Sequence, residues 1–458
     1  MCCAGRRLAA PVFLVLAFAA GCSGEPEAET RILFIGVDGL EWSVLAPMVR
    51  NGQAPHLRSL MERGVYGKLE TIEPNLSPVI WTTIATGKVP EKHGVVDFVE
   101  VDPDTGEARL FNRLDRKAKA FWNILSEWGD RVHVVGWFVT YPAEPIRGFM
   151  VSQYTSLARA IDLWKGSLYE GVPNQTYPES FFEELVPDIR KVAAESPALA
   201  DRVFGKDALD PAMGMEAQLV QHTLWALESD VLYARIAERI LESDPEFDVL
   251  AVYFGGPDVA GHRFWRYYRP EEYRFPPSAE RLDRFGDVVP TVYRMIDDRV
   301  GELLALCRDD VTVFVVSDHG MSAINQTVRF ESLERVRQMN SGHHLEAARS
   351  PGVIIAAGPG IRHDRSSDPS RVEPSSLDAL GSVLDVAPTL LYLRHAPAGK
   401  DMDGGLLDRI LDPRFLQDHP FETVETHESI GEAPDPEAFD EGMDEEMIKR
   451  FRALGYVD

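Results

Sequence analysis

The chain has 458 residues, enough for one large domain or about two to three ordinary ones. Hydrophobic residues make up 45% and charged residues 26%, which is typical of a globular protein rather than a disordered one. The formal net charge is -26 at pH 7, and so acidic a surface repels nucleic-acid phosphates. Composition therefore excludes nucleic acid as an expected partner, while part of the acidity could belong to a cation site.

The N-terminus has the pattern of an export signal. Arg6 and Arg7 precede an apolar run over residues 8–20 that is too short to span a bilayer comfortably. Small residues followed by Cys22 resemble a bacterial lipobox, which predicts a signal peptide over residues 1–22, cleavage before Cys22 and lipidation of that cysteine. Plain cleavage with an incidental Cys22 is the alternative. We expect an exported protein, lipid-anchored to a bacterial membrane and facing the periplasm or cell exterior, with residues 23–30 as a tether.

Short apolar runs rich in Val and Ile predict strands that are buried on both faces. These runs are residues 32–37, 132–137, 249–254, 311–316 and 353–357. Helical patterns lie between them, for example over residues 55–63 and 288–306. Because strands and helices alternate, we expect an α/β fold with a mostly parallel central sheet flanked by helices on both faces.

The strand and helix pattern predicts one main domain over residues 31–412. Within it, residues 156–245 are helix-rich and polar and show no clear strand, so we interpret them as an inserted cap region over the carboxyl edge of the sheet. From residue 413 to residue 458 the chain is an acidic tail, and it ends in a helical pattern over residues 444–454.

Three of the predicted strands deliver an aspartate at the carboxyl end: Asp38, Asp258 and Asp318. Ligand sites in open α/β sheets form at this edge, and burial gives no reason for three carboxylates there. His262 follows Asp258 by four residues, so the two face the same way if that turn enters a helix. His319 lies next to Asp318. Singly, each aspartate is best interpreted as a turn residue or helix cap; their joint placement predicts a functional site.

Two later histidines, His343 and His344, extend this set of candidate ligands. Carboxylate and imidazole together suit zinc, and also manganese or iron. Counting one of these two histidines, the set has six such ligands, which are too many for one tetrahedral zinc but suit a pair of metals. Two metals roughly 3.5–4 Å apart can clamp the attacking and leaving oxygens of a displacement at phosphorus.

The candidate nucleophile lies in residues 75–87, NLSPVIWTTIATG. Ser77 followed by Pro78 is a good pair for the N-cap and first position of a helix, and a helix N-terminus stabilises negative charge. Read alone, Ser77 is a structural cap. Beside metal ligands, coordination would lower the pKa of its hydroxyl and make it nucleophilic. The threonines further along fall inside the helical stretch, and Thr82 is the second candidate.

Together these motifs resemble the alkaline phosphatase superfamily, and within it the type I phosphodiesterase/nucleotide pyrophosphatase branch. The matching pieces are VDGL (37–40), TG (86–87), PEKHG (90–94), PDVAGH (257–262), SDHGM (317–321) and GVIIAAGPGI (352–361). The likeness covers roughly residues 31–150 and 245–410 and leaves the insertion uncovered. It implies an alkaline-phosphatase-like catalytic domain within residues 31–412.

The resemblance also assigns roles to single residues. It implies that Ser77, ten residues before Gly87, is the nucleophile. One divalent metal would be held by Asp38, Asp318, His319 and the Ser77 hydroxyl, and the other by Asp258, His262 and a later histidine. The family's pattern favours His344 for that last ligand, with His343 as the alternative. The implied cofactor is a pair of Zn²⁺ ions, with Mn²⁺ as the alternative.

The expected function is therefore metal-dependent hydrolysis of a phosphate ester, of phosphodiesterase or phosphomonoesterase type. The substrate would be a small molecule or a headgroup. A noncatalytic metal-binding lipoprotein that recognises a glycan or lipid headgroup is the alternative, although a degenerate site should have lost some of these ligands. A sulfatase is disfavoured. Sulfatases of this superfamily have a Cys or Ser in the pattern C/S-x-P-x-R, whereas here Pro78 follows Ser77 at once and no arginine follows before Lys88.

Overall fold

A computed structural model gives the fold. It describes residues 30–101, 108–153, 173–308, 310–324, 341–344, 350–364 and 368–428. The expected signal peptide, the expected lipidation site at Cys22 and the helical pattern of residues 444–454 lie outside these ranges, so they stay predictions. Within the described ranges, no helix combines the length and the apolar character that a membrane crossing requires.

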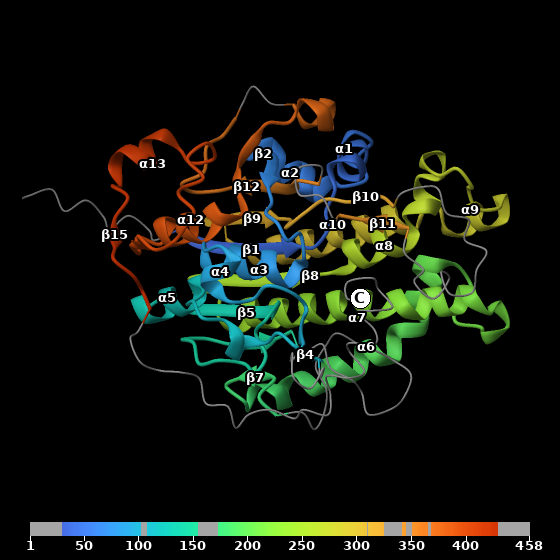
Figure 1. Ribbon diagram of the computed structural model, residues 1–458, viewed down its shortest axis with the longest axis horizontal. Coiled ribbons are helices and arrows are strands. Elements are labelled where there is room, and N and C mark those ends of the chain that lie inside the picture. The colour runs from blue at the N-terminus through green and yellow to red at the C-terminus, as the bar shows by residue number, and fades with distance from the viewer. Residues whose placement is uncertain are drawn as a thin grey trace, which may run out of the picture.

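A twisted sheet runs through the middle of the molecule (Figure 1). Its described strands follow the order β13-β2-β12-β9-β1-β8-β5-β6-β7. Their bounds are β1 Arg31–Val37, β2 Val65–Glu70, β5 Val132–Trp137, β6 Met150–Ser152, β7 Thr176–Tyr177, β8 Val249–Phe254, β9 Val311–Val316, β12 Gly352–Ala357 and β13 Ala379–Ser382. Of these, β12 and β7 run against the others. The mostly parallel sheet predicted from sequence is confirmed.

The three strands that end in aspartates are neighbours in this sheet. β1 lies between β8 and β9 and is parallel to both. In register, Gly36 of β1 pairs with Tyr253 of β8 and with Val316 of β9, so all three strands end at the same level. Apart from half-buried Arg31, their residues are buried. Fully covered strands explain the continuous apolar runs in the sequence.

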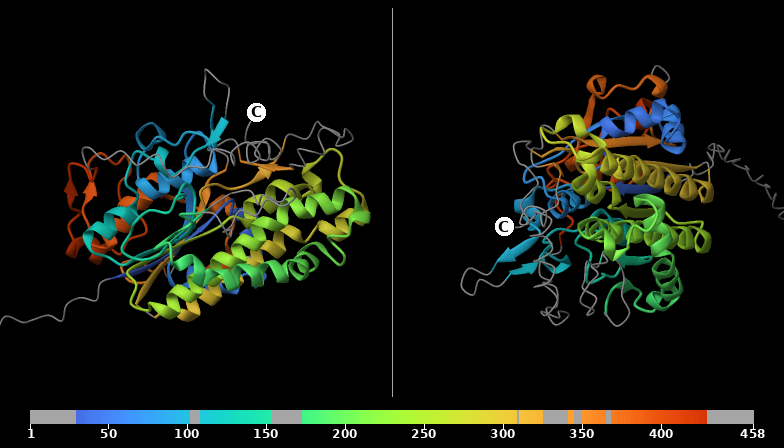
Figure 2. Two further views of the ribbon diagram at one scale, coloured as in Figure 1. Left: turned by 90° about the horizontal axis from the view of Figure 1, so that it is seen from below. Right: turned by 90° about the vertical axis from the view of Figure 1, so that its right-hand side faces the viewer.

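Helices cover both faces of the sheet (Figures 1 and 2). Alternate residues of β1 belong to two separate apolar cores, one on each face. One core includes residues of α1 Trp42–Arg50, α2 Pro55–Arg63, α6 Phe181–Phe204, α7 Met215–Ser243, α8 Gly256–Tyr268 and α10 Val288–Leu306. The other includes residues of α3 Ser77–Thr86, α5 Phe121–Trp128 and α12 Val386–Leu393. The expected three-layer α/β fold is therefore confirmed.

The described part of the insertion is helical, as expected. It consists mainly of α6 and α7, and apolar side chains of both helices belong to one of the two cores. α7 packs against β8 and against α8, so it supports both the helix that carries Asp258 and the strand before it. The short strand β7 was not predicted, because two residues give no detectable pattern. That the insertion covers the carboxyl edge as a cap stays a prediction.

Smaller elements complete the described chain. They are α4 Pro90–His93, α9 Ala279–Phe285, α13 Pro413–Asp418, β3 Val99–Val101, β4 Ala108–Leu110, β10 Ser322–Ala323, β11 Gly342–His343, β14 Ala398–Gly399 and β15 Thr423–Val424. Near the described C-terminal end, Lys88 forms ion pairs with Asp401 at 2.7 Å and with Glu428 at 2.8 Å. The loop behind α3 is thus tied to the segment that follows α12.

Candidate active site

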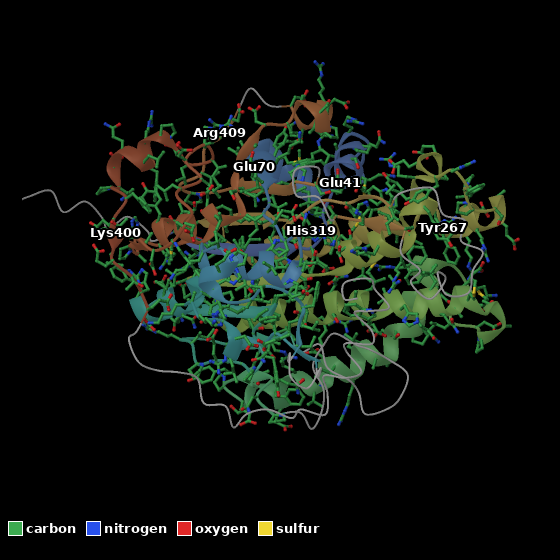
Figure 3. The ribbon with its side chains drawn as sticks, in the orientation of Figure 1. Glu41, Glu70, Tyr267, His319, Lys400 and Arg409 are labelled. Carbon is green, nitrogen blue, oxygen red and sulfur yellow. The ribbon has the colours of Figure 1, made fainter. Side chains whose placement is uncertain are left out.

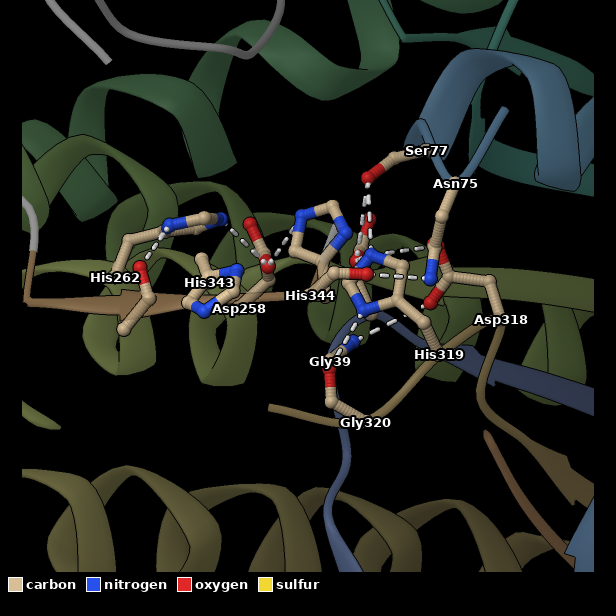
Figure 4. A network of polar contacts seen from close by, with 12 residues as sticks. Gly39, Asn75, Ser77, Asp258, His262, Asp318, His319, Gly320, His343 and His344 are labelled. Atoms are coloured by element: carbon tan, nitrogen blue, oxygen red, sulfur yellow. Dashed lines mark hydrogen bonds and ion pairs between the residues drawn. The ribbon is translucent and has the colours of Figure 1, made fainter. Parts of the chain in front are cut away.

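The predicted ligands meet where β1, β8 and β9 end. Figure 3 shows His319 near the centre of the molecule, and Figure 4 shows its neighbours. The residues that gather there are Asp38, Ser77, Asp258, His262, Asp318, His319 and His344, and none is more than 5% exposed. Such a buried group of acids and imidazoles is costly unless its charges are compensated.

Asp38, directly after β1, is held from one side. Its Oδ2 accepts hydrogen bonds from Tyr253 OH at 2.6 Å and from Trp81 Nε1 at 3.0 Å. Its Oδ1 lies 3.5 Å from Ser77 Oγ and 3.4 Å from His319 Nε2. The two neutral donors fix the carboxylate, so that its other oxygen faces the nucleophile candidate and the imidazole.

Ser77 faces the aspartates from the start of α3. Its Oγ lies 3.5 Å from both Asp38 Oδ1 and His319 Nε2. The expectation that Ser77 is the N-cap is wrong: Leu76 is the cap, with extended backbone angles and a carbonyl that accepts from Val79 and Ile80. Ser77 is the first helical residue, and its hydroxyl caps no backbone N–H. It is therefore directed at the ligand cluster while keeping its place at the helix N-terminus.

The threonines of α3 are engaged within their own helix. Thr82 Oγ1 donates to Pro78 O at 2.6 Å, and Thr86 Oγ1 donates to Thr82 O at 2.8 Å. Thr83 Oγ1 donates to Val79 O at 3.0 Å and also lies 3.0 Å from His93 Nε2. Such back-bonding is a common way to satisfy buried hydroxyls in helices. The expectation that these threonines fall within the helical stretch is confirmed.

Backbone carbonyls set the tautomers of two histidines. His319 Nδ1 lies 2.9 Å from Gly320 O, and His262 Nδ1 lies 2.9 Å from Gly342 O. A carbonyl only accepts, so Nδ1 carries the proton in both rings and Nε2 presents a lone pair. His262 Nε2 lies 3.3 Å from Asp258 Oδ1, and His319 Nε2 lies 3.3 Å from Asp318 Oδ2. In metal-ligating histidines the other ring N–H is likewise held by a carbonyl, which leaves the second nitrogen for the metal; here Nε2 of both rings points toward the neighbouring acids.

The structure separates His344 from His343. His344 is buried, its Nε2 lies 3.9 Å from Asp258 Oδ1, and its ring stacks on that of His319 at 3.6 Å between centroids. His343 is half-buried in β11, and it belongs to no cluster of potential metal ligands in the described ranges. Asn75 Nδ2 donates to His344 O at 2.5 Å, which ties the strand-to-helix loop before Ser77 to this histidine.

The potential ligands form two overlapping clusters. Asp258, His262 and His344 can each offer one atom within 4.8 Å of the others, and so can Asp38, Asp258 and His319. Asp258 belongs to both clusters, which the sequence did not predict. Buried carboxylates beside neutral imidazoles are a donor set that suits divalent zinc or manganese. The residues present therefore fit the pair of metals that the resemblance implied.

Crowding of acids perturbs their protonation. Burial, together with the charge of Asp258, raises the pKa of Asp38 to about 8, and burial with Asp38 nearby raises that of Asp318 well above its usual value. Burial also disfavours ionised Asp258, but His262, His344 and His319 outweigh it and lower its pKa. Burial lowers the pKa of His319 to about 4, so this ring is neutral at pH 7. A divalent cation would favour the ionised acids and offset the repulsion between their buried charges.

Several supporting residues escaped the sequence interpretation. Trp81 lies one helical turn after Ser77, so the spacing of four could have placed it on the same face. Tyr253 is the last residue but one of the buried apolar strand β8, and nothing in the sequence marks it as a partner of Asp38. Glu41 accepts hydrogen bonds from Ser43 N at 2.8 Å and Met321 N at 3.1 Å, which joins the loops after β1 and β9. Such contacts depend on which strands are neighbours.

Known structures are similar to this chain at low identity. A murine ectonucleotide pyrophosphatase/phosphodiesterase 5 is 13% identical, with 83% of this chain and 100% of that chain covered and a TM-score of 0.46. A putative sulfatase from Bacteroides thetaiotaomicron is 13% identical, with 83% and 74% covered and a TM-score of 0.49. A phosphonoacetate hydrolase from Sinorhizobium meliloti, in complex with phosphonoformate, is 18% identical, with 65% and 58% covered and a TM-score of 0.40. Similarity at this level does not indicate the substrate of this chain.

Sequence comparison identifies the family. No curated protein sequence matches the chain significantly. The profile of the type I phosphodiesterase/nucleotide pyrophosphatase family matches residues 32–385, which include every residue gathered at the site. The chain therefore belongs to the type I phosphodiesterase/nucleotide pyrophosphatase family, a family of phosphoric ester hydrolases within the alkaline phosphatase superfamily.

Proposed function

We propose that this protein hydrolyses phosphate esters with Ser77 as the nucleophile and two divalent metals as cofactors. The observation that carries the proposal is the position of Ser77 Oγ, 3.5 Å from both Asp38 Oδ1 and His319 Nε2. A serine that only began a helix would have no reason to face a buried acid and a neutral imidazole. Here it faces both, at a helix N-terminus that favours negative charge.

The chain's own residues hold the reacting groups. Ser77 Oγ forms a bond to phosphorus while the bond to the ester oxygen breaks, and the proton lost by Ser77 is balanced by the one that the leaving oxygen gains, which gives a phosphoserine and an alcohol. Water then breaks the Ser77–phosphorus bond, which restores the serine hydroxyl and releases the phosphate product. The N-terminus of α3 stabilises charge on the phosphoryl oxygens. Tyr253 and Trp81 hold Asp38, while the carbonyls of Gly320 and Gly342 keep two imidazoles in the tautomer that presents Nε2.

The metals would be held by residues that the structure brings together. Asp38, Asp318 and His319, next to Ser77, would hold one ion. Asp258, His262 and His344, which can each offer an atom within 4.8 Å of the others, would hold the other ion, and Asp258 also clusters with Asp38 and His319. When bound, such ions act as Lewis acids that lower the pKa of a hydroxyl and neutralise phosphoryl charge. Zinc suits these ligands, and manganese is the alternative.

Replacement of the nucleophile tests this proposal. Turnover of bis-p-nitrophenyl phosphate and p-nitrophenyl phosphate should be measured with zinc and with manganese, beside an aryl sulfate ester. We expect hydrolysis of at least one phosphate ester and a loss of about 1,000-fold or more in kcat for Ser77→Ala, because the threonine hydroxyls of the same helix all donate to backbone carbonyls. The diester and monoester rates also show which class of ester the site prefers.

Thr82→Val is the matched control. Thr82 lies on the same helix, its hydroxyl donates to Pro78 O, and valine has nearly the same shape. This variant should keep wild-type turnover. Metal content measured by atomic emission should stay at the wild-type level in both variants, so that a loss can be assigned to the hydroxyl. A Ser77→Ala protein with full turnover would show that Ser77 is not the nucleophile.

A further inference from the structure

Asp230 is a buried acid of the inserted helix α7 that the mechanism above does not use. It is 3% exposed. Its Oδ1 accepts a hydrogen bond from Gly255 N at 2.8 Å, and its Oδ2 accepts one from Gly256 N at 2.9 Å. Both amides belong to the junction between β8 and α8. A carboxyl group that accepts hydrogen bonds from two successive backbone amides, one on each oxygen, fixes the position of both amides.

The junction held by Asp230 is where α8 begins. α8 starts at Gly256 and carries Asp258 in its first turn and His262 one turn later. The first amides of a helix have no partner inside the helix, and here Asp230 supplies one from outside. The fit is close, because a Cβ on Gly256 would lie 2.4 Å from Asp230 Oδ2. A side chain at position 256 would therefore push the helix start away from α7.

We propose that Asp230 is a positioning residue that couples the inserted helix α7 to the metal ligands of α8. Its hydrogen bonds go to the amides of Gly255, the residue before α8, and of Gly256, the first residue of α8. It therefore acts on Asp258 and His262 through the start of the helix rather than by contact with a metal or substrate. The inference rests on the proposed two-metal function. It gives the insertion a task in this enzyme, which is to hold one pair of ligands in register with the ligands at β1 and β9.

Asp230→Asn in the full-length protein tests the coupling. Asparagine offers one acceptor oxygen, and its NH₂ group would face the second backbone N–H, so one hydrogen bond is replaced by a clash of donors. We expect two zinc ions to bind the wild type in a calorimetric competition titration. In Asp230→Asn, one of them should bind about 10–100-fold more weakly, as for other losses of support behind metal ligands.

Asp297 provides a matched control. It is 1% exposed, and its carboxylate accepts from Leu57 N at 2.8 Å and His56 N at 3.2 Å. It thus holds the start of α2 as Asp230 holds the start of α8, but α2 carries no candidate ligand. Asp297→Asn should destabilise the protein to a similar degree and leave both zinc affinities unchanged. Equal loss of zinc affinity in the two variants would reduce Asp230 to a general structural role and overturn the inference.

Hydrogen exchange of the metal-free proteins gives a readout that does not depend on zinc. Amides at the start of α8 should exchange faster in Asp230→Asn, and those at the start of α2 should exchange faster in Asp297→Asn. If Asp230→Asn does not fold, Gly256→Ala is the second variant, because its Cβ displaces the same contact while keeping the acid. We expect it to weaken the same single zinc ion.

The outcomes separate this inference from the proposed function. A wild-type protein that binds fewer than two metals contradicts the two-metal proposal and this inference with it. A wild type that binds two zinc ions and needs Ser77, beside an Asp230→Asn variant with both affinities and α8 exchange unchanged, overturns the inference alone. Selective loss of one ion in Asp230→Asn, with Asp297→Asn unaffected, supports it.

Discussion

At the residue scale, the site depends on which atom of each side chain is held by a hydrogen bond and which atom faces the other site residues. The Asp38 carboxylate is held through Oδ2 by two neutral donors, and Oδ1 faces Ser77 and His319. The His319 and His262 rings are held through Nδ1, which leaves Nε2 toward the acids. Orientation by such surrounding contacts usually decides metal affinity as much as the ligands do.

The choice between His344 and His343 can be tested at this scale. His344→Ala should remove one of two bound metals, because His344 lies within 4.8 Å of the Asp258 and His262 ligand atoms and is fully buried. His343→Ala should keep both, because His343 is half-buried in β11 and outside both clusters. Zinc per protein after gel filtration measures the difference. Loss of a metal in His343→Ala with retention in His344→Ala would reverse the assignment.

The candidate ligands could be picked out from the sequence, and the residues that support them could not. Asp38, Asp258 and Asp318 could be singled out because three predicted strands each lead to an aspartate, a joint placement that turns and caps do not explain. Tyr253 bonds to a residue that lies 215 positions earlier in the chain, and that contact exists only because β8 is a neighbour of β1. Sequence distance hides such pairs, since strand order is a property of the whole sheet.

At the scale of elements, α3 and α4 are joined by a buried histidine. Val95 N donates to His93 Nδ1 at 3.2 Å, so His93 carries its proton on Nε2 and donates it to Thr83 Oγ1 at 3.0 Å. The Thr83 hydroxyl in turn donates to Val79 O. This relay fixes the tautomer and connects the turn after α4 to the first half of the helix that carries Ser77.

The His93 relay predicts a pH dependence of stability. Burial, and then the charge of Arg116, lower the pKa of His93 to about 3. In the unfolded chain a histidine binds a proton below about pH 6.5, whereas His93 in the folded chain binds one only below about pH 3. The stability that neutral His93 contributes to the folded chain is therefore fully present above pH 6.5. It is lost as the pH falls toward 3, at up to about 1.4 kcal/mol of unfolding free energy per pH unit. A protonated ring would also lose its acceptor for Val95 N–H.

Urea unfolding of wild type and His93→Gln checks this sign. The variant should be less stable than wild type at pH 7.5, because it loses the relay. The difference in the free energy of unfolding should shrink as the pH is lowered to 6 and then 5, since glutamine does not titrate. A difference that stays constant over this range would mean that His93 protonates equally in the folded and unfolded chains.

The strands that were predicted and those that were missed differ in length and burial. β1, β5, β8, β9 and β12 match their predicted bounds to within one residue, since long buried runs of Val and Ile have few alternatives. β6, β7 and β13 have two to four residues and give no periodic signal. β2 was missed although it has six residues, because its side chains alternate between buried and more exposed positions and do not form a continuous apolar run. The reversed direction of β12 also escaped prediction, because composition carries no information on direction.

At the scale of the whole molecule, the active site and the fold compete for stability. The centre of the sheet edge holds three buried carboxylates, and the pKa values of Asp38 and Asp318 are raised mainly by burial. Ionising these groups without a cation costs folding free energy, because like charges then share a region of low dielectric. The ligand cluster is therefore a weak point of the metal-free protein.

Metal removal should expose this weakness as a change in thermal stability. Any ligand that binds only the folded state stabilises it, by about 2.7 kcal/mol for each site at 100 times its dissociation constant. We expect calorimetry to show a lower unfolding temperature after chelation and recovery after zinc is added back. The gain from zinc should grow between pH 6 and pH 8, because the acids and imidazoles must be deprotonated to bind. Ser77→Ala should show the same recovery if its ligands are intact, and equal unfolding temperatures with and without zinc would contradict a metal centre built into the fold.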